Sequence, residues 1–137
     1  MANQSDLARG WMRKGDSDRL DAQRTVRSDG PYDTACFHCQ QAVEKYLKAV
    51  LALAGLTIPR AHDLEEIYNH CLSVAPGLSV DTMELATLTP YRFNCAMTQN
   101  SGPTKPRLSK LLKSPTAFAP PFFANCHRQP FLECPGF

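Results

Sequence analysis

The sequence lacks any apolar run close to the roughly 18 residues that are needed to cross a bilayer. Its polar start, Met1 to Asp6, lacks the charged and apolar regions of a secretory signal. We therefore expect a cytoplasmic protein that does not enter a membrane. The chain also lacks a glycine-rich phosphate loop, a Ser-His-Asp arrangement and a catalytic pair of carboxylates. These absences lead us to predict no catalytic residue, no metal site and no cofactor.

Acidic residues are almost missing from the last third of the chain. Residues 1–91 hold 9 Lys and Arg against 12 Asp and Glu, whereas residues 92–137 hold 6 against one, Glu133. The prolines divide as 4 and 7 at the same point, and proline this dense disfavours helix interiors and central strands. Because 137 residues suit one domain, we predict a folded unit over 1–91 and an irregular, basic, Pro-rich tail over 92–137.

The first 91 residues predict an all-α fold. Apolar residues recur at helical spacing over 5–28, 35–54, 63–74 and 81–88. The first stripe consists of Leu7, Trp11, Leu20 and Val26. Asp33 or Thr34 is the expected N-cap of the second helix, with Gly55 after its end, and Asp63 is the expected N-cap of the third. The second helix has an apolar face broad enough for two neighbouring helices, and we expect part of it to be shared with a partner subunit.

Six cysteines are divided evenly between the two parts of the chain. In a cytoplasmic protein we expect free thiols rather than disulfides. Cys36 and Cys39 have the spacing of a zinc knuckle, but the same spacing also follows one face of a helix. A zinc site needs about four ligands, so the pattern favours packing in the core.

The second helix and the segment after it resemble the HEPN domain family of prokaryotes. The resemblance rests on the string Phe-His-x-Gln-Gln-Ala-x-Glu-Lys, from Phe37 to Lys45, and on Ala61-His-Asp-Leu64. Trp11 and the stretch Leu88-Thr-Pro-Tyr91 also fit. Similarity is greatest to the branch encoded beside minimal nucleotidyltransferases. The resemblance implies an up-and-down antiparallel helical bundle, commonly a homodimer, with a nucleotidyltransferase as partner protein.

Members of this family generally continue after the tyrosine with one more long helix, which has no counterpart in residues 92–137. A shifted reading frame near codon 91 explains the missing helix and the change of composition together. The alternative is a native tail that binds a partner, for example nucleic acid through its basic residues.

Six polar residues are our candidates for contact with a ligand or partner. They are His38, Gln41, Glu44 and Lys45 on the second helix, with His62 and Asp63 after it. These groups either line a cleft for a nucleotide or rim the bundle. The pair His62-Asp63 is similar to the metal-binding pair of HD phosphohydrolases, but one pair supplies too few ligands. We therefore favour helix capping by Asp63 and local pairing of His62.

The ribonuclease members of the family carry an arginine that is separated from a histidine by four to six intervening residues. None of the four histidines here has that arginine, so the pattern favours a non-catalytic module. We predict a nucleotide- or substrate-binding subunit, or a toxin–antitoxin partner, of a separately encoded nucleotidyltransferase. The alternatives are a ribonuclease toxin that lacks the usual motif and an inactive truncated fragment.

Overall fold

A computed structural model of the chain describes residues 3–78, 85, 86, 88 and 89. Their regular structure is helical: α1 spans Gln4–Arg27, α2 spans Tyr32–Leu53 and α3 spans Leu64–Leu72. The all-α prediction is confirmed. Of the helix expected over 81–88, Leu85, Ala86 and Leu88 are described and helical. The tail over 92–137 lies outside the described residues.

The ends of the helices follow local chemistry. The side chain of Asn3 caps α1, and Asp63 caps α3 by accepting the backbone N–H groups of Glu65 and Glu66. At the end of α2, Gly55 has a φ of +71°, and the N–H of Leu56 donates to the carbonyl of Leu51, as in a Schellman motif. These features confirm the predictions for Asp63 and Gly55.

The expected start of α2 was wrong. The helix begins at Tyr32 with Pro31 at the N-cap position and no side-chain cap, so Asp33 and Thr34 lie inside its first turn. Proline is favourable at the start of a helix because the first N–H groups have no partner within the helix. Before it, Asp29 and Gly30 both have positive φ and turn the chain back on itself.

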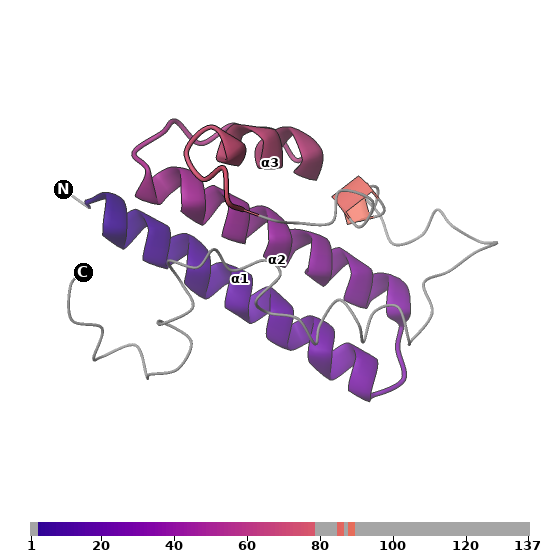
Figure 1. Cartoon of the computed structure of the whole chain (residues 1–137). Helices are drawn as coiled ribbons and strands as arrows, with labels where there is room; N and C mark the ends of the chain where they lie inside the picture. Colours follow the sequence, from indigo (N-terminus) through magenta and orange to yellow (C-terminus); the bar gives the residue numbers. More distant parts are fainter. Residues whose placement is uncertain (1–2, 79–84, 87, 90–137) are drawn as a thin grey trace.

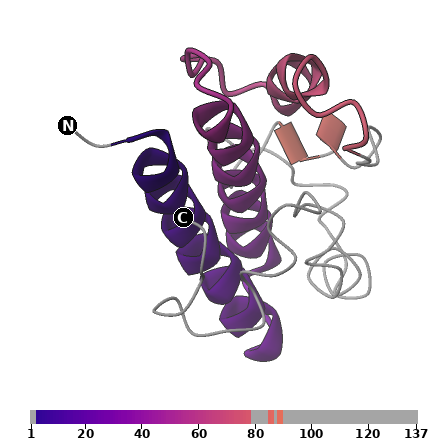
Figure 2. The ribbon, with the colours of Figure 1, turned by 60° about the vertical axis from the view of Figure 1, so that its left-hand side comes forward.

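Helices α1 and α2 lie side by side and antiparallel (Figures 1 and 2). Small residues recur every seven positions on the buried side of each helix: Ala8, Gly15 and Ala22 on α1, and Ala35, Ala42 and Ala49 on α2. A Cβ atom added to Gly15 would lie 3.3 Å from the carbonyl oxygen of Ala42. The two backbones therefore approach closely along this seam.

The close packing along this seam also explains why the buried stripe of α1 differs from the predicted one. Leu7 and Leu20, which were expected on the buried stripe of α1, are 47% and 42% exposed. The buried stripe is instead formed by the small residues together with Met12 and Val26, so the larger leucines fall on its flanks. Val26 is buried as predicted, and Trp11 packs partly buried against the core.

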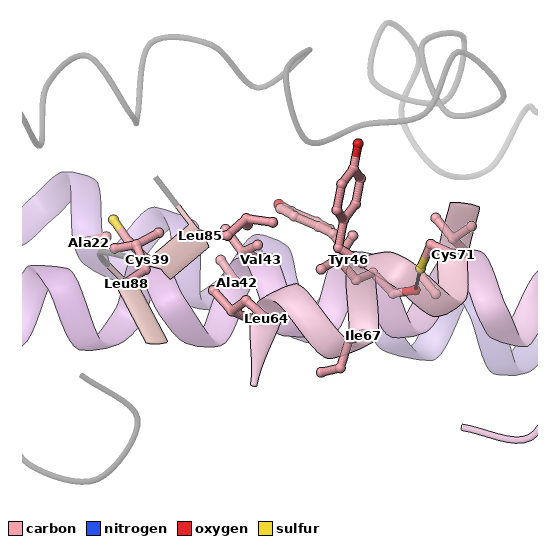
Figure 3. Packing of buried hydrophobic residues seen from close by; sticks show 14 of the residues in the cluster. Ala22, Cys39, Ala42, Val43, Tyr46, Leu64, Ile67, Cys71, Leu85 and Leu88 are labelled. Atoms are coloured by element: carbon pink, nitrogen blue, oxygen red, sulfur yellow. Dashed lines mark hydrogen bonds between the residues drawn. The ribbon is translucent and has the colours of Figure 1, made fainter. Parts of the chain in front are cut away.

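Helix α3 and the residues near its ends complete the core on another side of α2. Figure 3 shows Leu64, Ile67 and Cys71 gathered with residues of α2 and with Leu85 and Leu88. The thiol of Cys71 donates to the carbonyl of Leu47 at 3.3 Å. Two helices thus pack against α2, as its broad apolar face predicted. Whether a partner subunit shares that face stays a prediction.

Candidate functional site

Two polar clusters flank α2, and four of the six candidate residues belong to them. The first cluster joins α1 to α2 through Asp18. One oxygen of Asp18 lies 2.9 Å from Nδ1 of His38, and the other accepts a hydrogen bond from Nζ of Lys45. All three side chains are at least three-quarters buried. Asp18 is thus the partner of both His38 and Lys45 within the molecule, and these contacts join α1 to α2.

The second cluster surrounds a buried carboxylate. We call Gln40, Glu44, Lys48 and His62 the Glu44 network. Oε1 of Glu44 accepts hydrogen bonds from Nζ of Lys48 at 2.8 Å and from Nδ1 of His62 at 3.1 Å. Oε2 accepts one from Nε2 of Gln40 at 3.1 Å. Gln40, Glu44 and Lys48 follow one another at intervals of four, so α2 places them in a row.

The Glu44 carboxyl is only 7% exposed, yet it is ionised at neutral pH. Burial alone would raise the pKa of Glu44. Hydrogen bonds from Lys48 and Gln40, the charge of Lys48 and the hydrogen bond from His62 outweigh that effect and lower the pKa below its usual value. A buried charge is costly unless it is paired and hydrogen-bonded, and here both conditions are met.

His62 is the accessible member of the Glu44 network. Its side chain is 52% exposed, although its ring contacts a carboxylate that is almost fully buried. The backbone carbonyl of His62 accepts a hydrogen bond from Nε2 of Gln40 at 3.4 Å. Asp63, the next residue, holds the first turn of α3 at 2.9 and 3.1 Å. His62 is therefore held through its ring, its own backbone and its neighbour.

Lys48 of the Glu44 network also lies near Trp11, and so does Lys14. The ammonium groups of Lys14 and Lys48 each lie 5.6 Å from the ring centroid of Trp11, a distance at which a cation is attracted to an aromatic ring. Lys14 is exposed, and so is Arg60, two residues before His62. The exposed imidazole of His62 is suited to hydrogen bonding with a polar ligand.

The sequence profile of the HEPN domain matches residues 8–99. That match spans more than half of the chain and includes both polar clusters. The chain belongs to the HEPN domain family. Searches of curated proteins and of solved structures each gave no match.

Within this HEPN domain, the six candidate residues have different surroundings. Glu44 and His62 meet, whereas His38 and Lys45 share Asp18. Gln41 donates to Oε1 of Gln40 at 2.7 Å and so touches the edge of the Glu44 network. Asp63 is a helix cap, as predicted. The expectation of local pairing for His62 was wrong, because its partner lies 18 residues earlier in the chain.

The spacing of Glu44 and Lys48 predicts an ion pair along one helix, which is confirmed, but Asp18, Gln40 and Lys48 were not among the candidate site residues. The spacing of Gln40, Glu44 and Lys48 is a signal that could have identified them as one row. Their burial was not foreseen, because polar residues at such positions usually face solvent. Asp18 carried no signal, since its partners lie on another helix.

Metal binding and thiol chemistry have little support in this part of the molecule. No three His, Cys, Asp or Glu side chains of the described residues gather as metal ligands would. Cys36, Cys39 and Cys71 are buried thiols rather than members of a disulfide, as predicted, and burial raises the pKa of Cys39 and of Cys71 to about 12. Those two thiols therefore stay protonated at neutral pH. Among the described residues, no helix is long and apolar enough to cross a membrane.

Proposed function

We propose that this HEPN domain is the nucleotide- or substrate-binding subunit that works with a separately encoded nucleotidyltransferase, in the manner of a toxin–antitoxin pair. Membership of the family supports the proposal. The observation that carries it is the contact of Glu44 with His62, which presents an oriented and accessible imidazole. A nucleotide offers hydroxyl groups, with which an imidazole can form hydrogen bonds.

The ligand contacts in this proposal come from His62 rather than from His38 and Lys45. The carboxylate of Asp18 already occupies the latter two. Their function is to hold α1 against α2, and Gln41 and Asp63 support the Glu44 network from its edge. We propose a homodimer as the active form.

Two measurements test the proposal. The protein is expressed with the nucleotidyltransferase of a neighbouring gene, and the complex is isolated and sized by light scattering. AMP and ATP are then titrated while the fluorescence of Trp11 is followed, since the chain has one tryptophan. We expect a stable complex and an affinity that His62→Ala lowers about tenfold, the equivalent of one good hydrogen bond.

His70→Ala is the matched control, because His70 is an exposed histidine in the last turn of α3. It should leave the affinity unchanged. A protein that forms no complex and binds neither nucleotide would refute the proposal. RNA cleavage that His38→Ala abolishes would instead support the ribonuclease alternative.

A further inference from the structure

The Glu44 network determines which nitrogen of His62 carries a proton. Because the carboxylate of Glu44 is ionised, it can only accept hydrogen bonds. The contact of 3.1 Å with Nδ1 therefore requires a proton on that nitrogen. In the neutral imidazole, Nε2 then carries a lone pair and accepts a hydrogen bond.

That acceptor is held in position before any ligand arrives. The ring of His62 is oriented by its hydrogen bond to Glu44, and the carbonyl of His62 accepts a hydrogen bond from Gln40. The next residue, Asp63, is fixed because it caps the first turn of α3. Nε2 makes no hydrogen bond to another residue in the part of the chain that the structure describes, and half of the side chain is exposed. Lys48 already balances the charge of Glu44, so the ion pair is complete without the histidine. The bond between His62 and Glu44 orients the imidazole, and an oriented group loses less entropy when it binds.

We infer that Nε2 of His62 accepts a hydrogen bond from a ribose hydroxyl of the bound nucleotide. The inference rests on the proposed function and specifies which part of the nucleotide this site recognises. Phosphate oxygens are acceptors, and they do not pair with the lone pair of a neutral imidazole. The donors that a nucleotide offers are its ribose hydroxyls and, on some bases, an amino group. The hydroxyls are common to all ribonucleotides.

A series of nucleotides tests this assignment by isothermal titration calorimetry on the full chain. The probes are AMP, 2′-deoxy-AMP, 3′-deoxy-AMP, 2′,3′-dideoxy-AMP and IMP, which lacks the amino group of adenine. We expect the dideoxy nucleotide to bind about tenfold more weakly than AMP, one monodeoxy nucleotide to share that loss, and IMP to bind like AMP.

His62→Ala should remove the discrimination. The variant should bind AMP and dideoxy-AMP equally, both at the weaker affinity, while His70→Ala keeps the full difference. Circular dichroism confirms that each variant is folded. Equal binding of AMP and dideoxy-AMP by the unaltered protein overturns the inference, and so does a loss confined to IMP, which would point to the base.

The outcomes separate this inference from the proposal on which it rests. If the protein forms the nucleotidyltransferase complex and binds AMP without regard to its hydroxyls, the proposed function stands and the inference fails. Displacement of AMP by inorganic phosphate at the same concentration would also overturn the inference, because it would mean that the site recognises phosphate. Absence of AMP binding overturns both the inference and the nucleotide-binding role.

Discussion

Gly15 of α1 lies directly against the aromatic ring of Tyr46 of α2. A Cβ atom at position 15 would be 2.8 Å from Cε1 of that ring, closer than real carbon atoms approach. The ring cannot easily retreat, because its hydroxyl donates to Asp16 at 2.6 Å. Gly15 therefore allows the two helices to pack at this distance, at the cost of a weak helix former inside α1.

Gly15→Ala is expected to lower the free energy of unfolding by up to about 2 kcal/mol. The overlap with Tyr46 costs about 1 to 3 kcal/mol, and the higher helix propensity of alanine returns about 1 kcal/mol. Urea denaturation followed by circular dichroism measures the change. Gly10→Ala is the matched control, because a Cβ at position 10 meets nothing within 4 Å. That variant should be slightly more stable than the unaltered protein. Equal effects of the two changes would contradict the close packing of α1 against α2 at Gly15.

Asp18→Asn should destabilise the protein by about 1 to 2 kcal/mol. The change weakens the contacts with His38 and Lys45, and hydrogen bonds to charged groups of this burial are worth about that much. Asp21→Asn provides the comparison, because Asp21 pairs with Arg24 at 3.2 Å and these side chains are 46% and 73% exposed. A surface pair contributes less than about 1 kcal/mol. If Asp21→Asn costs as much as Asp18→Asn, Asp18 does not hold the two helices together.

The ionisation of Glu44 should make stability depend on acid pH. The pKa of Glu44 in the folded protein is lower than its usual value of 4.5, so its charge stabilises the fold above pH 4.5. This stabilisation disappears as the pH falls through the folded pKa. The difference in unfolding free energy between the unaltered protein and Glu44→Gln should be constant from pH 7 to about 5 and should shrink below pH 4.5. Chemical denaturation at a series of pH values measures it, and a difference that grows toward acid pH would contradict the assignment.

The helices of this domain could be predicted from the sequence because their signals are local. Apolar spacing and the capping chemistry of Asp63 and Gly55 act over a few residues, and both were confirmed. The buried side of α1 could not be predicted in the same way. The close approach at Gly15 selects small residues for that side, and this depends on α2, which the spacing within α1 does not show.

The candidate site could be predicted only in part, because its contacts join residues that are far apart in the chain. The similarity to the HEPN family identified Glu44 and His62, but not that they would meet. Their contact depends on how residues 54–63 return to the middle of α2. The contact of Asp18 with His38 likewise joins two helices, and the two residues are 20 positions apart in the chain. Spacing along one helix cannot reveal it.

The most direct test of the central claim, that His62 is the ligand-binding group of this HEPN domain, is a nitrogen-15 NMR measurement of the imidazoles during addition of AMP. Before addition, the neutral imidazole of His62 should carry its proton on Nδ1, because that nitrogen donates to Glu44, and this leaves the lone pair on Nε2. On saturation with AMP, the Nε2 resonance of His62 should shift in the direction of hydrogen bonding, while the resonances of His70 stay in place. If the resonances of His62 do not move while AMP binds, or if His70 moves in its place, the claim is contradicted.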